Sequence, residues 1–351
     1  MLYSLDEICL IPKAKTNISH RSDINIMYGD KLPLFISPMG NIIDANNMYI
    51  FNNLGFNVII PRTVHWDIRL SRLKEGHWIA VGLRESELLF DLMLKGNIGM
   101  YNTVMKVCID QANGHMEDLL NICGKYKNEF GDKVLIMAGN IANPQAYVEY
   151  AKVGIDYIRL GIGTGNICTT SVQTGVHYPM GSLILDTNKV RNSIVEKRGD
   201  DQWEYKLPKI IADGGFKSID QVIKALALGA DYVMLGEMIA KSEEACGNVI
   251  YDNNTNTRLR EYYGMSTEKA QYLINNSSAF RDSNFTPKHT EGIRKYLPIE
   301  YSINDWLKDF THALRSSMSY LNINNINCLP GQVKWDTMSI HSSNNYKDGK
   351  Q

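Results

Sequence analysis

Residues 210–236 read IIADGGFKSIDQVIKALALGADYVMLG, and this stretch contains the pattern that repeats along the chain. Two short apolar runs, 210–212 and 232–235, flank a segment with helical spacing at 219–228, and Gly229 follows it as a C-terminal cap. Continuous apolar runs are typical of strands that are covered on both faces, as in parallel sheets. The stretch therefore predicts one strand–helix–strand unit.

Similar apolar runs occur earlier in the chain, and each ends near Gly, Pro, Asp or Asn. They lie at 34–37, 57–60, 79–81, 106–109, 134–137 and 157–160. Together with the two runs above they make eight predicted strands, and eight strand–helix units in one chain predict an α/β fold of the closed (β/α)8 type, the TIM barrel. A doubly wound open sheet is the alternative, but eight repeats favour closure.

The domain organisation follows from the same reading. We expect a single catalytic domain over residues 1–321. A flap of about 248–300, beginning with a hairpin, is predicted to be inserted after the eighth strand. Within it, residues 266–291 lack strong periodicity, which is typical of an active-site lid. Apolar spacing predicts a helix over 303–321, and the polar, Asn-rich residues 322–351 are predicted to form a frayed tail.

The composition is typical of a globular protein and narrows the kinds of partner to expect. The chain has 351 residues, of which 44% are hydrophobic and 21% charged, and its net charge is −1. Such a balance gives no sign of a nucleic-acid or membrane partner. Six cysteines without a CxxC pair argue against a zinc site and a disulfide framework. The N-terminus lacks the pattern of a secretory leader and no apolar run is long enough to span a membrane, so a cytoplasmic location is expected.

Residues 161–179, GIGTGNICTTSVQTGVHYP, form a glycine-rich loop after a predicted strand. Gly161, Gly163 and Gly165 allow the backbone to adopt positive φ and to approach a ligand closely. Cys168 stands at the end of these glycines, where backbone amides can surround a thiolate, so the placement favours a nucleophile. The alternative is a small buried thiol, which is the commoner role of an isolated cysteine.

Two other kinds of glycine loop do not match this one. A dinucleotide fingerprint needs glycine at the position that Asn166 occupies, and a P-loop needs a Gly-Lys-Ser/Thr run that is missing here. The loop is therefore not expected to bind a pyrophosphate in either way.

The ends of the last two predicted strands carry a second candidate site. Asp213, Gly214 and Gly215 follow the seventh strand, and Gly236 and Glu237 follow the eighth. In barrels of this type these loops commonly bind phosphate through backbone N–H groups. The alternative is a pair of tight turns that need glycine for their geometry. The barrel prediction favours phosphate.

These motifs resemble the IMP dehydrogenase/GMP reductase family over about residues 5–321. The Cys168 loop is similar to the active-site loop of that family, and its TTxxxTGVxYP continuation is nearer to the GMP reductases. The N-terminal segment with SLDEICLIPK and HRSD, the block IADGG…KALALGADYVMLG, the DQANGH block and the YGMS block also match. The resemblance implies a barrel enzyme that acts on a purine mononucleotide, GMP or IMP.

The resemblance also implies roles for particular residues. Cys168 would be the nucleophile that attacks C2 of the purine, and Thr170 and Glu291 would deliver protons. Ribose hydroxyls, phosphate and the purine edge would be bound by a larger set, which comprises Asp213, Gly214, Gly215, Gly236, Glu237, Tyr263, Gly264, Met265 and Ser266.

The family uses a nicotinamide cofactor, and NADPH is the one implied here. Its binding residues would be Asp110, Ala112, Asn113, Gly114 and Arg281. A monovalent cation such as K+ would be held by backbone carbonyls of Gly163, Gly165 and Cys168. A homotetramer is also expected by resemblance.

Several departures from the family pattern decide the direction of the reaction. IMP dehydrogenases place an Arg-Tyr pair in the flap to activate water, whereas Asp282 follows Arg281 here. There is also no room for tandem regulatory domains between the second and third strands. GMP reductases in turn usually carry His-Lys after the second strand, where this chain has Arg62, so that arginine must replace the lysine or the role is lost.

The sequence therefore predicts a GMP reductase that converts GMP to IMP and ammonia with NADPH through a covalent cysteine intermediate. An NAD-dependent IMP dehydrogenase without regulatory domains and a non-catalytic purine-nucleotide sensor are the alternatives. A sensor would need the phosphate-binding glycines but not Cys168, Thr170 and Glu291 together.

Overall fold

The structure is a computed structural model that describes residues 1–98, 103–197, 206–288, 290–339 and 342. Its centre is a closed barrel of eight parallel strands, as predicted. The strands are β2 (Leu34–Ile36), β3 (Asn57–Ile60), β4 (Trp78–Val81), β5 (Met105–Asp110), β6 (Val134–Ile141), β7 (Tyr157–Leu160), β8 (Lys209–Asp213) and β9 (Tyr232–Leu235).

Closure of the barrel comes from the pairing of its first and last strands. Leu34 pairs with Val233 and Ile36 pairs with Leu235, in parallel register. Each strand is short and apolar, because its two faces are covered by the barrel interior and by the outer helices. Every apolar run singled out in the sequence therefore forms one strand of the barrel.

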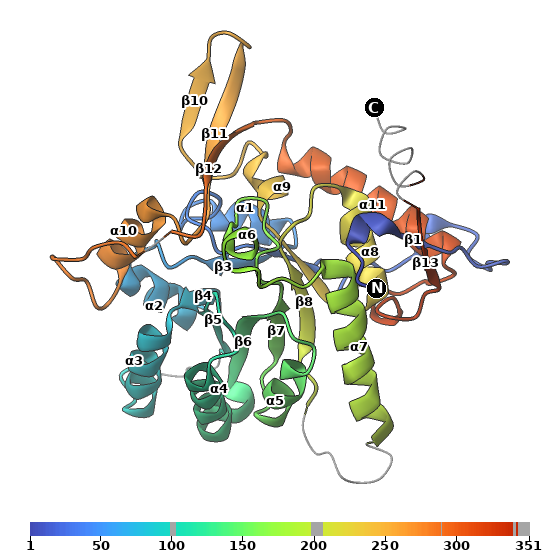
Figure 1. Cartoon of the computed structure of the whole chain (residues 1–351). Coiled ribbons are helices and arrows are strands. Elements are labelled where there is room, and N and C mark those ends of the chain that lie inside the picture. The colour runs from blue at the N-terminus through green and yellow to red at the C-terminus, as the bar shows by residue number, and fades with distance from the viewer. Residues whose placement is uncertain (99–102, 198–205, 289, 340–341, 343–351) are drawn as a thin grey trace.

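Helices cover the outside of the barrel (Figure 1). The helices of the described residues are α1 (Met48–Asn53), α2 (Trp66–Lys74), α3 (Leu83–Leu94), α4 (Glu117–Phe130), α5 (Ala146–Lys152), α6 (Thr170–Thr174), α7 (Met180–Lys197), α8 (Ile219–Leu228), α9 (Glu237–Ala240), α10 (Glu268–Ser277) and α11 (Ile303–Tyr320). Of these, α6 belongs to the loop after β7 and α10 to the segment between β11 and β12. The predicted helix over 303–321 corresponds to α11, whose buried face includes Trp306, Phe310, Leu314 and Met318. No helix in the part of the chain that the structure describes is long and apolar enough to cross a membrane.

The interior of the barrel is filled by side chains. Phe35, Trp78, Tyr157 and Tyr232 contact one another at ring-centre distances between 5.1 and 6.1 Å, mostly edge to face. Smaller apolar residues such as Ile59, Met137 and Met234 complete this cluster. A filled interior leaves the loops beyond the carboxyl ends of the strands as the place where a ligand can bind.

The segment after β9 forms a small separate sheet and a helix. Strand β11 (Thr257–Tyr263) pairs antiparallel with β10 (Val249–Asp252) and with β12 (Arg294–Pro298), so the hairpin expected there is present. Figure 1 shows this hairpin projecting away from the barrel. Between β11 and β12 the chain forms α10, whereas the sequence pattern predicts an irregular lid over 266–291.

The end of the chain packs on the barrel where a frayed tail was expected. Strand β13 (Trp335–Thr337) pairs antiparallel with β1 (Ile8–Leu10) near the N-terminus. The 3₁₀ turn Ile326–Cys328 precedes it, and the side chain of Ile326 is fully buried. Further short 3₁₀ helices are Leu5–Glu7, Arg21–Asp23 and Gly131–Lys133. The expectation of a frayed tail is therefore wrong for residues 322–338, because they bury apolar side chains and complete a two-stranded sheet.

Candidate active site

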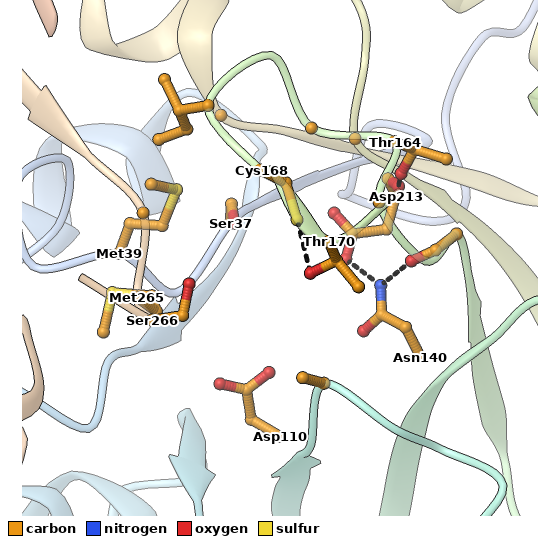
Figure 2. A pocket seen from close by; sticks show the side chains of 18 of the residues that line it. Ser37, Met39, Asp110, Asn140, Thr164, Cys168, Thr170, Asp213, Met265 and Ser266 are labelled. Carbon is orange, nitrogen blue, oxygen red and sulfur yellow. Dashed lines mark hydrogen bonds between the residues drawn. The ribbon is translucent and has the colours of Figure 1, made fainter. Parts of the chain in front are cut away.

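A cavity of about 540 Å³ lies at the carboxyl ends of the barrel strands. Its wall consists of loops that follow β2, β3, β5, β6, β7, β8 and β9, together with part of the segment after β11 (Figure 2). Most of the residues singled out in the sequence line it. They are Asp110, Ala112, Gly163, Gly165, Cys168, Thr170, Asp213, Gly214, Gly215, Gly236, Glu237, Gly264, Met265, Ser266 and Glu291.

Cys168 is the thiol on this wall, and it is connected to two other side chains. Its Sγ donates a hydrogen bond to Thr170 Oγ1 at 3.3 Å, which Figure 2 marks with a dashed line. Thr170 Oγ1 in turn donates to Glu291 Oε2 at 2.5 Å. A short bond from a hydroxyl to a carboxylate is charge-assisted and therefore strong. The three groups form a continuous path for a proton from the sulfur to the carboxylate.

Backbone pairing places Glu291 beside the cysteine loop. The Thr169 N–H donates to the carbonyl of Glu291 at 3.1 Å, and the Ile293 N–H donates to the carbonyl of Ile167 at 3.0 Å. These bonds attach the segment before β12 to the loop after β7. The carboxylate is therefore positioned by main-chain contacts, and not only by its own side-chain bond.

The same loop contains the carbonyls that were assigned to a monovalent cation. The Gly163 carbonyl accepts a bond from Ser171 Oγ at 3.2 Å, and the Gly165 carbonyl accepts one from the Cys168 N–H at 3.0 Å. Each carbonyl oxygen keeps a second lone pair. Thr169 Oγ1 is buried and has no hydrogen-bond partner among the described residues. Oxygens of this kind are the hard ligands that such a cation takes, and the cation site stays a prediction.

Arg159, which belongs to none of the predicted site motifs, links two carboxylates at the cavity wall. Its side chain, from the middle of β7, is 6% exposed. Nη1 donates to Asp110 Oδ1 at 2.5 Å, while Nε and Nη2 donate to Asp213 Oδ2 at 3.1 and 2.8 Å. Burial alone would lower the pKa of the guanidinium, but Asp213 and Asp110 hold that pKa well above its ordinary value.

Asn140 completes this network, as Figure 2 shows. Its Nδ2 donates to Asp213 Oδ2 at 2.8 Å and to the carbonyl of Gly161 at 2.9 Å. Thr164 Oγ1 donates to the main-chain carbonyl of Asp213 at 2.8 Å. Asp213 is thus fixed from three sides, and its Oδ1 has no hydrogen bond to the described residues.

The loops after β8 and β9 form the other end of the cavity. Gly214 and Gly215 have φ values of 95° and 86°. Residues that carry a Cβ atom rarely adopt such positive φ values, so glycine is needed at both positions. A Cβ atom on Gly236 would lie 2.8 Å from the hydroxyl of Tyr262. Both loops therefore bring bare backbone to the edge of the cavity, which suits a polar or anionic group.

The segment after β11 contributes Gly264, Met265 and Ser266 to the cavity wall. Tyr263, assigned with them in the sequence, is buried outside the wall. Its ring lies 5.0 Å from the ammonium of Lys269, and its carbonyl accepts a bond from Asn41 Nδ2 at 2.9 Å. The position of Tyr263 is that of a structural support for this segment.

Three residues assigned to the cofactor lie away from the cavity wall. The Gly114 N–H donates to the carbonyl of Asn140 at 2.7 Å, and the side chain of Asn113 accepts a bond from the N–H of His115 at 3.0 Å. Arg281 is exposed beyond α10 and does not line the cavity. Asp110 and Ala112 are the assigned cofactor residues that do.

Arg62, from the loop after β3, lines the same cavity. Its Nε is buried and has no hydrogen-bond partner among the described residues. Arg62 Nη2 lies 2.5 Å from the position that a Cβ atom on Gly82 would take, so glycine there leaves room for the guanidinium. Arg62 therefore lies at the cavity, and whether it takes the role of the family lysine stays a prediction.

The structure therefore combines a closed parallel barrel with a thiol, a hydroxyl and a carboxylate that line one cavity at its carboxyl end. Residues 97–346 match the model of the IMP dehydrogenase / GMP reductase domain. The chain belongs to this family, and the resemblance in its motifs is confirmed.

Three curated relatives illustrate the similarity. A GMP reductase of Aliivibrio fischeri (strain MJ11) is 32% identical over 236 residues, which is 65% of this chain and 59% of that protein. A GMP reductase of Aliivibrio salmonicida (strain LFI1238) shows the same identity and coverage. A GMP reductase of Yersinia enterocolitica (serotype O:8 / biotype 1B, strain NCTC 13174 / 8081) is 30% identical over 267 residues, 73% of this chain and 68% of the relative. The chain thus spans about three fifths of the length of the first of these relatives.

Proposed function

We propose that this chain catalyses the reductive deamination of GMP to IMP and ammonia, with NADPH as the reductant. The hydrogen-bonded series Cys168, Thr170 and Glu291 on the cavity wall carries the proposal. The similarity to proteins named GMP reductase supports it.

The first half of the reaction exchanges the 2-amino group for sulfur. Cys168 Sγ forms a bond to C2 of the guanine, and the thiol proton moves to Thr170 Oγ1 as the hydroxyl proton moves to Glu291. The proton then returns along the same path to the 2-amino group, the C2–N bond breaks and ammonia leaves. The product is a thioimidate in which C2 is bonded to Cys168. A covalent intermediate divides a difficult exchange into two smaller barriers.

The second half exchanges sulfur for hydrogen. NADPH, when bound, supplies a hydride to C2. The C2–S bond breaks, Cys168 leaves as a thiolate, and it recovers a proton through Thr170. Because the first proton left with ammonia, the proton that Cys168 recovers is taken up from solvent and passes through Thr170.

Other groups on the wall would hold the substrate. Asp213 has a free Oδ1 for the ribose hydroxyls, since Arg159 and Asn140 occupy its Oδ2. Met265 and Ser266 approach from the opposite segment and would contact the base.

The cavity also fits a nicotinamide cofactor. Asp110 and Arg62 line it, and the guanidinium of Arg62 would bring positive charge toward a carboxamide or phosphate oxygen. We assign Arg62 the place of the family lysine in this role. A K+ ion in the Cys168 loop and a homotetramer are further parts of the proposal that the family resemblance supports.

The test is incubation of the protein with GMP and NADPH. Loss of the reduced-nicotinamide absorbance and release of ammonia should occur in equal amounts, and both should stop in Cys168→Ala. Faster oxidation of IMP by NAD+ would identify a dehydrogenase. Binding of GMP without turnover would identify a sensor.

A further inference from the structure

Helix α10 carries two side-chain amides, Gln271 and Asn275, on one of its faces. Residues that stand four positions apart are neighbours on the surface of a helix. Asn275 is 9% exposed, and Gln271 is half-buried and lines the main cavity. A side-chain amide in such a place needs partners for both its donor and its acceptor, so the partners of these two residues show what the helix holds.

Each amide binds the main chain of one residue beyond the helix. Gln271 Oε1 accepts the N–H of Lys288 at 2.8 Å, and its Nε2 donates to the Lys288 carbonyl at 3.2 Å. Asn275 Oδ1 accepts the N–H of Asp282 at 3.1 Å, and its Nδ2 donates to the Asp282 carbonyl at 2.9 Å. Asp282 and Lys288 lie in irregular backbone, so each amide supplies the donor and acceptor that a neighbouring strand would otherwise supply.

Gln271 also joins two parts of the cavity wall. Its Nε2 donates to the carbonyl of Ser266 at 3.0 Å, and both Ser266 and Lys288 line the cavity. Glu291 follows Lys288 by three residues. Three residues of extended chain span at most about 10 Å, so the attachment of Lys288 limits how far Glu291 can move from the wall.

Beyond Glu291 the chain is held by the cysteine loop. The Thr169 N–H donates to the Glu291 carbonyl at 3.1 Å, and the Ile293 N–H donates to the Ile167 carbonyl at 3.0 Å. Glu291 is thus attached on both sides, and its Oε2 accepts the Thr170 hydroxyl at 2.5 Å. Hydrogen bonds depend steeply on distance, and a misplacement of about 1 Å costs roughly a hundredfold in rate. The proton path therefore depends on both attachments.

We propose that Gln271 and Asn275 are positioning residues, which hold the segment before Glu291 so that its carboxylate stays within hydrogen-bond distance of Thr170. The inference rests on the proposed function, because it takes proton transfer to Glu291 as given. The two amides should therefore matter for the half of the reaction that uses this carboxylate, and much less for hydride transfer.

The test replaces each amide by an apolar side chain of similar shape, in Gln271→Met and Asn275→Leu. The kcat for GMP reduction should fall by about tenfold to a hundredfold in Gln271→Met and by about fivefold in Asn275→Leu, whose partner Asp282 is farther from Glu291 along the chain. The rate of the NADPH burst from IMP and NADP+ should change by less than about twofold, since that step requires no proton for an amino group.

Asn276→Leu is the matched control. Asn276 is exposed on the same helix, and its side chain makes no hydrogen bond to the described residues. This variant should leave the rates of both half-reactions unchanged, because it removes an amide of the same kind that holds nothing. Equal losses in both half-reactions of Gln271→Met would overturn the inference and would indicate a general disturbance of the site.

A double-mutant cycle tests whether Gln271 acts through Glu291. In the Glu291→Gln background, Gln271→Met should lower kcat by less than about twofold, because the effects of residues that act as a unit do not add. The same loss in both backgrounds, or an unchanged kcat in Gln271→Met alone, would overturn the inference.

Hydrogen exchange gives a readout that needs no turnover. The Thr169 N–H, which is bonded to the Glu291 carbonyl, should exchange roughly tenfold faster in Gln271→Met than in the wild type or Asn276→Leu, as measured by mass spectrometry of the peptides that contain it. Unchanged exchange would overturn the inference. Absence of GMP turnover in the wild type, together with faster exchange at Thr169 in the variant, would refute the proposed function and support the positioning of Glu291.

Discussion

Replacement of Glu291 by Gln is expected to interrupt the proton path of the site. The carboxylate accepts the Thr170 hydroxyl at 2.5 Å, and that hydroxyl accepts the Cys168 thiol at 3.3 Å. Glutamine has nearly the same shape but takes up no proton. The main-chain bond between residue 291 and the Thr169 N–H, at 3.1 Å, does not depend on the side chain, so the segment should remain in place.

The expected magnitude follows from two contributions. Loss of the carboxylate removes the acceptor of the thiol proton, which slows formation of the carbon–sulfur bond. The departing amino group also loses its proton donor, and a missing acid–base group typically costs about 10²–10⁴-fold. We therefore expect kcat for GMP reduction to fall by about 10²–10⁴-fold, with KM changed by less than about threefold.

The assay separates the two halves of the reaction. Steady-state reduction of GMP requires ammonia to leave, whereas hydride abstraction from IMP with NADP+ does not. Glu291→Gln should retain more of the second activity, which appears as a stoichiometric burst of NADPH without ammonia.

Variants of Thr170 provide the control. Thr170→Ser keeps the hydroxyl and should be active, whereas Thr170→Val should resemble Glu291→Gln. Equal losses in both half-reactions of Glu291→Gln, or full activity of Thr170→Val, would refute the relay. Glu291 would then be a residue that binds substrate or closes the site.

Three further changes test other parts of the site. Cys168→Ala should abolish turnover but change the GMP affinity measured by calorimetry by less than about threefold, because other loops make the binding contacts. A rate within about tenfold of wild type would show that Cys168 is not the nucleophile. Arg159→Leu should leave Asp110 and Asp213 unpaired and lower the free energy of unfolding, measured in urea, by about 3–5 kcal/mol, and Arg159→Lys should have a smaller effect. Equal stability of the wild type and the Leu variant would show that the Arg159 ion pairs do not stabilise the fold. Gly215→Val should weaken GMP binding and lower the free energy of unfolding by about 1–3 kcal/mol, because φ is 86° and a Cβ atom would lie 2.7 Å from the Thr164 carbonyl oxygen. Normal GMP binding in this variant would show that another loop binds the phosphate.

The barrel could be predicted because its signal is local. Runs such as 79–81 and 210–212 are apolar throughout, and each lies within one strand of the barrel. The helix at 303–320 likewise follows from its apolar spacing. In each case burial acts on neighbouring residues of one element, so the pattern is visible without the fold.

Other elements have no such local signal. Helix α10 is polar and Asn-rich, and its start depends on the Thr267 side chain, which accepts a bond from the N–H of Ala270. Strand β13 is three residues long and gains its partner, Ile8–Leu10, from the opposite end of the sequence. Contacts made across such a separation leave no periodicity to read.

The site shows the same division. The sequence by itself identified Cys168, its glycine loop and the strand-end residues, because chemistry at the carboxyl ends of strands leaves recognisable local motifs. The sequence also places Arg159 in an otherwise apolar run, where a buried charge requires partners. The apolar spacing does not identify those partners. Only barrel closure brings Asp110 and Asp213 to that guanidinium.

Tertiary structure likewise decided that Glu291 meets Thr170, 121 residues away, and that Glu237 accepts a bond from Asn166, 71 residues away. Hydrogen bonds and Coulomb forces depend on distances of a few ångströms between side chains. Those distances are set by the packing of the whole barrel, whereas the spacing of apolar residues along the chain is set by each element alone.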